Sequence, residues 1–351
     1  MSEKIEVGIL GATGTVGQEF IAELVDHPWF RVGWIGASER SAGKAYREAT
    51  PWRLPALRPD DVADMVVERV TPVTPGRAPR LLFSGLDSSV AGEVETAVAE
   101  AGHLVVSNAR NHRMDPVVPL VIPEINADHL GLLDRQQAAR GWAGGIVTNP
   151  NCSTVVLTMA LAPLCQFGLR QVIVSTLQAI SGAGHPGIAS LDIVGNVVPH
   201  IVGEEPKMET EPQKILGRLT DEGVEPHGVV VSASTTRVPV VNGHTELVTV
   251  ALDQPVEERA ILDAWAGFAG RPQEAALPSA PPRPVLYLAE PDRPQPRLDA
   301  DRDGGMTVTV GRLRVCPVLD YKFVAMGHNT VRGAAGAALL NAELMKVDGR
   351  L

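Results

Sequence analysis

The stretch from Thr148 to Val156, TNPNCSTVV, places a cysteine where it could act as a nucleophile. A β-type run, GGIVT, ends just before Asn149-Pro150-Asn151, and Cys152 opens a run of small and apolar residues that predicts a helix. A thiol at a helix N-terminus meets the positive end of the macrodipole and backbone N–H groups, which favour the thiolate. The competing interpretation is a small buried hydrophobic residue.

A cysteine nucleophile needs a partner that handles its proton, most often a histidine. His244 is the best candidate of nine histidines, because a strand is expected after it, Gly243 precedes it and Arg237 lies seven residues earlier. His185, in the glycine-rich turn SGAGHPG, is the fallback. Four others are interpreted as surface or packing residues, namely His27, His103, His112 and His129.

A glycine-rich loop stands at the first expected strand-to-helix junction, in VGILGATGTVGQEF. Gly11 and Gly14 would let the backbone turn tightly and approach a pyrophosphate, which the following helix N-terminus stabilises. The alternative is a tight turn without a ligand. The second strand is followed by SERSAGK, in which Ser38, Arg40 and Ser41 suit a 2′-phosphate, so NADP is favoured over NAD. Glu39 would weaken that preference if it turned inward.

The elements that must position these residues fall into two groups, as expected for 351 residues. Short strands alternate with helices in the first part, which predicts a Rossmann-type parallel sheet, with strands at 5–10, 31–37, 65–70, 80–85 and 104–107 and helices at 15–25 and 89–101. Longer β-rich runs follow and predict an α+β domain with a largely antiparallel sheet, with strands at 171–180, 229–235, 246–252, 285–288, 306–310 and 321–325 and helices at 152–165, 207–219 and 257–268.

We therefore expect an α/β chain with a dinucleotide-binding domain of residues 1–151, completed by a small-residue C-terminal helix within 329–351, and a second domain of residues 152–328. The proline- and charge-rich stretches 271–284 and 291–305 are expected to be exposed loops. A net charge of −10 gives no general attraction to nucleic acid or to an anionic membrane. Three cysteines cannot all pair and no leader is recognised, so a cytoplasmic location without a structural metal is expected.

Taken together, the motifs resemble aspartate-β-semialdehyde dehydrogenase, particularly its archaeal and fungal branch. The resemblance covers essentially the whole chain and is carried, in order, by GATGTVG, SERSAGK, SNARNHRM, VIPEIN, NPNCST, QAISGAGHPG, GEEPKMETEPQKIL, RVPVVNGHTE and HNTVRGAA. It implies an architecture similar to glyceraldehyde-3-phosphate dehydrogenase and a homodimer or homotetramer formed through the second domain. It also implies a small-molecule substrate.

The resemblance implies a role for each matching residue. Cys152 would form a covalent acyl-enzyme with His244 as acid and base, while Asn151 helps to hold the thioester oxygen. Gln178 would position the thioester. The substrate's charged groups would meet Arg237 at the α-carboxylate, Arg113 and Lys207 at the phosphate, and Glu204 or Glu205 at the α-amino group. The expected cofactor contacts are Gly11, Thr13, Gly14, Thr15, Val16, Ser38, Arg40, Ser41, Ser181, Gly182 and Asn329.

The implied reaction is the NADPH-dependent reductive dephosphorylation of L-aspartyl 4-phosphate to aspartate 4-semialdehyde, in the biosynthesis of lysine, threonine, methionine and isoleucine. A substrate with phosphate, carboxylate and ammonium groups suits two arginines, a lysine and a glutamate. The rivals are a malonyl-CoA or succinyl-CoA reductase on the same scaffold, an N-acyl-glutamyl-phosphate reductase, and a catalytically idle NADP-binding regulator. The segments EEPKMETEP and SNARNHRM disfavour the N-acyl-glutamyl-phosphate reductase. The joint presence of Cys152 and His244 disfavours the idle regulator.

Overall fold

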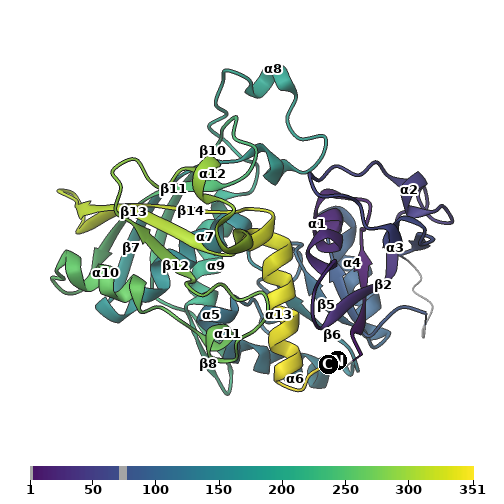
Figure 1. The fold of residues 1–351 in the computed structure, drawn as a ribbon. Coiled ribbons are helices and arrows are strands. Elements are labelled where there is room, and N and C mark those ends of the chain that lie inside the picture. Colours follow the sequence, from purple (N-terminus) through teal and green to yellow (C-terminus); the bar gives the residue numbers. More distant parts are fainter. Residues whose placement is uncertain (1–2, 71–76) are drawn as a thin grey trace. The chain divides into compact units, whose positions relative to one another are not determined.

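The computed structural model describes residues 3–70 and 77–351 (Figure 1). These residues form two compact units, each with its own six-stranded sheet. The first unit comprises residues 1–121, 128–149 and 338–351, and the second comprises 122–127 and 150–337.

The first unit contains a parallel sheet with the strand order β3-β2-β1-β4-β5-β6. Its strands are β1 (Ile5–Leu10), β2 (Phe30–Ala37), β3 (Glu68–Arg69), β4 (Leu81–Ser84), β5 (Leu104–Ser107) and β6 (Gly145–Thr148). The strand order reverses beside β1, which creates the switch point where doubly wound sheets bind ligands. The predicted Rossmann-type parallel sheet is confirmed.

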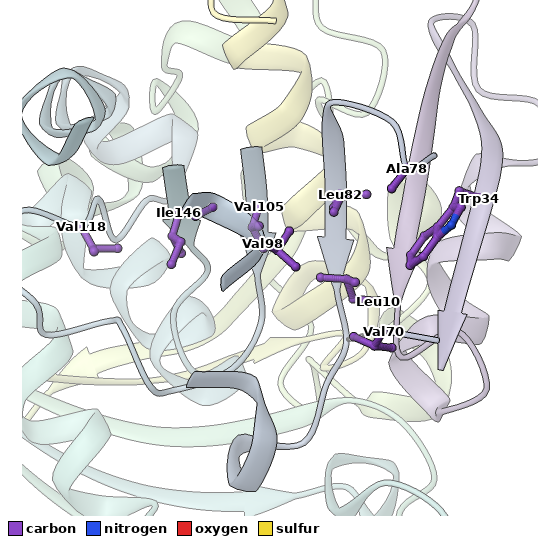
Figure 2. Close-up of a cluster of buried hydrophobic side chains, with 10 residues drawn as sticks. Leu10, Trp34, Val70, Ala78, Leu82, Val98, Val105, Val118 and Ile146 are labelled. Carbon is purple, nitrogen blue, oxygen red and sulfur yellow. The ribbon is translucent and has the colours of Figure 1, made fainter. Parts of the chain in front are cut away.

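Short connecting helices and a buried apolar cluster complete this unit. Its helices are α1 (Thr15–Leu24), α2 (Tyr46–Ala49), α3 (Asp60–Ala63), α4 (Ser88–Glu100) and α6 (Leu132–Arg140). Figure 2 shows Leu10, Leu82, Val105 and Ile146 arranged along neighbouring strands, with Val98 of α4 beside them. Burial of these side chains stabilises the sheet that carries the glycine loop.

The last part of the chain is tied into the first unit by polar contacts. It lies in α13 (Gly336–Val347). Asn341 Nδ2 donates to Asn149 Oδ1 at 2.7 Å, and Glu343 Oε1 lies 2.7 Å from His27 Nε2. His27 and Glu343 are both buried, so His27 is a packing residue as the sequence indicates.

The second unit contains a mixed sheet with the strand order β10-β7-β11-β14-β13-β12. Its strands are β7 (Leu169–Gln178), β10 (Val230–Arg237), β11 (His244–Leu252), β12 (Val285–Leu288), β13 (Val308–Val315) and β14 (Tyr321–Gly327). The three central pairings are antiparallel, and the pairings at the two edges are parallel. The sheet is thus largely antiparallel, as predicted, and its β7–β10 edge brings two strand C-termini together.

Helices cover one face of this sheet, and the other face is partly exposed. The alternation along β7 is regular, with Val172 and Val174 buried and Ile173 exposed between them. The helices are α5 (Pro123–Asn126), α7 (Cys152–Leu161), α8 (Ser190–Ile193), α9 (Glu205–Ile215), α10 (Glu258–Ala266), α11 (Arg271–Glu274) and α12 (Pro296–Asp299), and a hairpin joins β8 (Arg218–Thr220) to β9 (Gly223–Glu225).

Some predicted elements are wrong in detail. The strand expected at 65–70 is reduced to β3, because Val66 forms only an isolated bridge with Ala45. The helix expected at 207–219 ends at Ile215, and the chain then enters β8. The stretch 291–305 is not simply an exposed loop, because buried Asp299 binds the side chains of Arg293 and Arg302.

Candidate active site

Cys152 is the first residue of α7, and Asn151 caps that helix. The Asn151 side-chain oxygen accepts from the backbone N–H groups of Ser153 and Thr154, each at 3.1 Å. The helix is buried from Ser153 to Leu161, which explains its continuous run of small and apolar residues, whereas Cys152 itself is only half-buried. The sulfur therefore lies at the positive end of a rigid helix.

His244, the first residue of β11, faces this sulfur. Its Nε2 lies 3.2 Å from Cys152 Sγ, and its Nδ1 accepts the backbone N–H of Ala179 at 3.1 Å. Because Nδ1 acts as an acceptor, the neutral imidazole carries its proton on Nε2. Burial and, next, the positive charge of Arg237 lower the pKa of His244 to about 3. His244 is thus neutral and directs an N–H at the sulfur, where it stabilises a thiolate.

The other two cysteines lie in different surroundings. Cys165 and Cys316 are also free. Burial raises the pKa of the Cys165 thiol to about 11, so this thiol is unreactive at neutral pH. Cys152 is therefore a better nucleophile than Cys165.

A close contact from the end of the second unit locks Cys152 in place. The π-helical turn Val331–Ala335 brings Gly333 against it, and a Cβ at position 333 would lie 2.6 Å from Cys152 Cβ. Arg332 of the same turn makes two hydrogen bonds to Glu124, both at 2.7 Å, and both side chains are fully buried. Only glycine fits at position 333, and the buried ion pair holds the turn that carries it.

The C-terminal ends of β7 and β10 place Gln178 and Arg237 next to each other as register partners. Arg237 is buried, and its Nη1 donates to the carbonyl of Ala179 at 2.7 Å. Burial lowers the pKa of Arg237, while the opposite charges of Cys152 and Glu204 raise it. The guanidinium is therefore a fixed cation within electrostatic range of the sulfur. Buried Gln178 donates to Thr176 Oγ1 at 3.3 Å.

Glu204 and Lys207 form a second charged element at the start of α9. Glu204 Oε2 pairs with Lys207 Nζ at 2.9 Å, and Glu204 Oε1 accepts from Asn151 Nδ2 at 2.8 Å. Burial raises the pKa of Glu204, but Lys207 and the Asn151 amide outweigh it and hold this pKa below its usual value. Glu205 instead accepts from the backbone N–H of Thr235 at 3.0 Å. Of the two adjacent glutamates, Glu204 is therefore the one hydrogen-bonded to Asn151, the residue beside the nucleophile.

Three residues predicted at the cofactor site also meet in the second unit. Asn329 Nδ2 donates to Ser181 Oγ at 2.8 Å, and Asn329 Oδ1 accepts the backbone N–H of Gly243 at 2.9 Å. A Cβ at Gly182 would lie 2.9 Å from Arg237 Nη1. The loop of Ser181 and Gly182 is thereby held against the His244 and Arg237 side chains.

In the first unit, the glycine loop has the geometry of a phosphate cradle. Gly11 has a φ of +81°, and a Cβ there would lie 2.9 Å from the carbonyl of Gly85. Gly14 is the N-cap of α1 and no side chain caps that helix, so Thr15 and Val16 begin it with their backbone directed at the loop. Thr13 lies within the turn. This arrangement fits a dinucleotide pyrophosphate.

The loop after β2 presents the residues expected at a 2′-phosphate. Ser38 and Arg40 are exposed, whereas Ser41 is buried. The Glu39 carboxylate forms an ion pair with Arg69. Because Arg69 compensates the negative charge of Glu39, this carboxylate repels a bound 2′-phosphate less than an unpaired carboxylate would.

Arg113 lies in the first unit, in the segment that follows β5. It is 6% exposed, and its Nη2 donates to the carbonyl of Asn108 at 2.7 Å. Its backbone N–H is bonded to the carbonyl of Arg110. The guanidinium is thus held by its own segment of chain.

Sequence reasoning missed three contributors to the site. Glu124 and Arg332 lie inside the segments VIPEIN and HNTVRGAA, where one acid and one base among apolar residues are a usable signal for a buried pair. Glu211 Oε2 accepts the backbone N–H of Asn151 at 2.7 Å, and nothing in its charged helix distinguishes it from its neighbours. In chemical terms, the second unit combines a nucleophilic sulfur, a proton on Nε2, a cation and a carboxylate, which suits acyl transfer from a zwitterionic substrate.

Comparisons with known proteins agree with this chemistry. Residues 6–133 match the family model described as semialdehyde dehydrogenase, NAD binding domain, and residues 161–332 match semialdehyde dehydrogenase, dimerisation domain. An aspartate-semialdehyde dehydrogenase of Archaeoglobus fulgidus is 49% identical over 97% of this chain and 98% of its own length. That of Cryptococcus neoformans is 47% identical over 97% of this chain and 96% of its own.

Solved structures give the same result. The aspartate semialdehyde dehydrogenase of Candida albicans, solved with NADP, has a TM-score of 0.91 and 39% identity, over 99% of this chain and 100% of its own. Aspartate semialdehyde dehydrogenase II of Vibrio cholerae, complexed with ASA, has a TM-score of 0.79 and 25% identity over 99% of both chains.

The geometry predicts which cysteine reacts. Iodoacetamide should alkylate Cys152 at least about tenfold faster than Cys165 at pH 7, because α7 and His244 stabilise the Cys152 thiolate and burial disfavours the Cys165 thiolate. Peptide mass spectrometry against time measures both rates. Cys152→Ser should fold yet lose turnover by at least about 100-fold, whereas Cys165→Ser should remain active. Equal alkylation rates, or an active Cys152→Ser variant, would contradict the assignment.

Proposed function

Because the chain belongs to the aspartate-semialdehyde dehydrogenase family, we propose that it catalyses the NADPH-dependent reductive dephosphorylation of L-aspartyl 4-phosphate to L-aspartate 4-semialdehyde. This reaction would serve the biosynthesis of lysine, threonine, methionine and isoleucine. The observation that carries the proposal is the Cys152–His244 pair, with its 3.2 Å contact, flanked by Arg237 and by the Glu204–Lys207 pair.

The charged groups of the site match those of the substrate one by one. Arg237 binds the α-carboxylate, because a buried planar guanidinium suits bidentate carboxylate recognition. Glu204 binds the α-ammonium. Lys207 and Arg113 are the proposed phosphate-binding cations. Glu205 is left out of this set because its carboxylate accepts from the Thr235 backbone.

The covalent step uses groups that the structure places around the sulfur. The Cys152 thiolate attacks the acyl carbon, the carbon–oxygen bond to phosphate breaks, and phosphate leaves with the bonding electron pair, so that a thioester remains. The Asn151 and Gln178 side-chain amides, each with a second N–H beyond the one bonded to Glu204 or Thr176, are the proposed hydrogen-bond donors for the acyl oxygen. His244 holds a proton at Nε2, where it faces the sulfur. NADPH, when bound, supplies the hydride for the reduction.

The proposed cofactor contacts are the residues that the sequence predicts. Gly11, Thr13, Gly14, Thr15 and Val16 hold the pyrophosphate. Ser38, Arg40 and Ser41 meet the 2′-phosphate, and Ser181, Gly182 and Asn329 complete the site. The cradle at Gly11, the exposed Arg40 side chain and the NADP named for the Candida albicans structure support this choice.

The domain roles follow from this assignment. We propose a dinucleotide-binding domain of residues 1–151 completed by 329–351, and a catalytic and dimerisation domain of residues 152–328. The inclusion of residues 338–351 in the first compact unit supports the return of the chain end to this domain, whereas residues 122–127 and 329–337 belong to the second compact unit. Among the described residues no helix is long and apolar enough to cross a membrane. A cytoplasmic location is proposed because the three cysteines are free.

Self-association is proposed to use the exposed face of the second sheet. Ile173, Val230 and Leu247 are 49%, 61% and 48% exposed on three neighbouring strands. Apolar side chains grouped on an exposed sheet face are typical of an interface. The family model that covers these strands is described as a dimerisation domain, which favours a second copy of this chain as the partner.

The substrate's ammonium distinguishes this function from a CoA-thioester reductase. A malonyl or succinyl thioester also presents a carboxylate to Arg237, but it has no cation for Glu204. The Glu204 carboxylate, kept ionised by Lys207 and Asn151, favours the aspartyl substrate. The arrangement of a nucleophile, an oriented histidine and a cation also argues against an idle regulator.

The function is tested through Glu204. Glu204→Gln should reduce kcat/KM for aspartate semialdehyde by at least about tenfold in the phosphate- and NADP-dependent oxidation, because a buried charge contact is lost on one side. Glu205→Gln is the matched control and should change it less, since Glu205 serves the backbone. Wild type should turn over malonyl-CoA poorly. Efficient use of malonyl-CoA with no use of aspartate semialdehyde would overturn the proposed substrate.

Cofactor choice is tested at Arg40. Arg40→Ala should raise KM for NADPH at least about tenfold more than KM for NADH, because only NADPH offers a 2′-phosphate for a charge-assisted hydrogen bond. Steady-state rates with each cofactor give both constants. Arg297→Ala, at an exposed position in the second unit, is the control. Equal effects on the two cofactors would remove Arg40 from this role.

The interface is tested by charge. Replacing Ile173 and Leu247 together by lysine should shift the sedimenting species from an oligomer to a monomer, because like charges on a buried face repel each other and lose solvation. Analytical ultracentrifugation measures the masses. Leu191→Lys, at a residue 94% exposed on α8, should leave the oligomer unchanged. An intact oligomer in the double variant would exclude this face.

A further inference from the structure

A buried polar cluster lies in the first unit. Glu95 projects from α4 and is fully buried. Its Oε1 accepts from Ser84 Oγ at 2.6 Å and from Ser107 Oγ at 2.7 Å. Ser84 ends β4 and Ser107 ends β5, so a single carboxyl oxygen joins two neighbouring strand ends at the edge where such sheets bind ligands.

The other oxygen of Glu95 faces a histidine. Glu95 Oε2 lies 3.7 Å from His112 Nε2, and neither atom has a hydrogen-bond partner among the residues that the structure describes. The His112 ring is hydrogen-bonded to the backbone of Gly92. Because Nε2 has no such partner, Nδ1 makes this bond and donates its proton to the Gly92 carbonyl. The nitrogen that faces Glu95 is therefore the one that can gain or lose a proton.

This facing pair is best satisfied by one proton. With one, an O–H or an N–H of one group faces the acceptor atom of the other across 3.7 Å. With none, a carboxylate faces the imidazole lone pair, and with two, an O–H faces an N–H, so each of these states leaves buried polar atoms opposed. Burial raises the pKa of Glu95 and lowers that of His112, so each group resists its charged form.

The charged groups around the pair are few. Arg113 acts on Glu95 and lowers its pKa. On His112, Arg140 lowers the pKa and Asp115 raises it, and these two residues are themselves ion-paired. The sequence-based interpretation of His112 as a packing or surface residue is incomplete, because its side chain is 11% exposed and its ring faces a buried acid.

The pair lies at the base of the segment that carries Arg113. The Asn108 backbone N–H donates to the Ser84 carbonyl at 3.1 Å, and Arg113 in turn donates to the Asn108 carbonyl at 2.7 Å. Asn111 Nδ2 donates to the Ser88 carbonyl at 2.9 Å. His112 lies between Asn111 and Arg113, so its ring is attached to the same short backbone segment from which the Arg113 guanidinium projects.

We propose that Glu95 and His112 share one proton across their facing side chains and thereby position the segment that presents Arg113 to the phosphate group. Both are positioning residues, since they act through Arg113. The inference rests on the proposed function, in which Arg113 binds phosphate, and it adds a pH-dependent control of phosphate affinity.

Two substitutions at Glu95 separate positioning from bulk. Glu95→Gln keeps both hydrogen-bonding functions of the protonated glutamate. Its amide oxygen can accept from the two serines, and its amide N–H can donate to His112 Nε2 at every pH. Glu95→Met keeps the approximate volume and removes both functions. The assay is the phosphate-dependent oxidation of aspartate semialdehyde by NADP, with KM measured separately for phosphate and for the semialdehyde. Glu93→Gln, exposed on the same helix, is the matched control.

At neutral pH, Glu95→Met should raise KM for phosphate about five- to tenfold with kcat and the semialdehyde KM within about twofold, as expected for one lost hydrogen bond. Glu95→Gln should restore the wild-type value. As pH rises, the wild-type pair loses its proton and KM for phosphate should rise relative to Glu95→Gln, which has no such proton to lose. The ratio of the two cancels the ionisation of phosphate itself.

Parallel alkaline profiles for wild type and Glu95→Gln would overturn the proposal, as would an unchanged phosphate KM in Glu95→Met. If Glu95→Met does not fold, the Glu95→Gln profile decides alone. Arg113→Ala separates the two levels of inference. If Arg113→Ala raises KM for phosphate and the Glu95 variants do not, the proton-sharing inference fails by itself. If Arg113→Ala leaves KM for phosphate unchanged, the proposed phosphate role of Arg113 is wrong, and the proton-sharing inference is then wrong as well.

Discussion

Asn151 is the residue on which the rest of the catalytic arrangement depends. Its side-chain oxygen caps α7, its backbone N–H donates to Glu211, and its amide nitrogen donates to Glu204. Its carbonyl accepts the first helical bond, from Val155. Nearly every polar atom of Asn151 is therefore hydrogen-bonded. These bonds hold the N-terminus of α7, which would otherwise fray, in one conformation. Cys152, the next residue, is therefore held in position as well.

A second constraint on Cys152 comes from the turn Val331–Ala335. The Arg332–Glu124 pair is fully buried and bidentate, and it holds a π-helical turn whose Gly333 leaves no room for a side chain beside Cys152. Removing one partner of such a pair typically costs about 3 to 5 kcal/mol, because the other charge is left buried. The Arg332–Glu124 ion pair therefore stabilises the position of the turn that carries Gly333. π-helical turns are frequent at functional sites, where they aim backbone that a regular helix would direct elsewhere.

Local chemistry in the sequence was enough to predict the parts of the site that depend on short segments. The helix start at Cys152, the glycine loop and the alternating strand of β7 each follow from neighbours within one element. Contacts between distant segments were not predictable in this way. Arg332 and Glu124 are separated by 208 residues, and Glu211 lies 60 residues from Asn151. His112, in a turn, looked unremarkable because its partner Glu95 lies on α4.

The choice between Glu204 and Glu205 shows the same limit at the smallest scale. Adjacent residues at a helix start point in different directions, so identical side chains in EEPK reach Asn151 in one case and Thr235 in the other. Only the packing of α9 against α7 and β10 decides which carboxylate turns toward the sulfur. The family resemblance identified Glu204 and Glu205 as candidates and left the two equivalent.

The Glu204–Lys207 ion pair has a consequence for inhibitors. In the protein alone, each charge is the counter-ion of the other. A ligand that offers both an ammonium and an anion can replace the two partners at once, whereas a ligand with a single charge separates the pair and leaves one member buried without compensation. Neutral compounds are therefore poorly matched to this ion pair. Compact zwitterions with an electrophilic carbon between their charges are the scaffolds that these surroundings select.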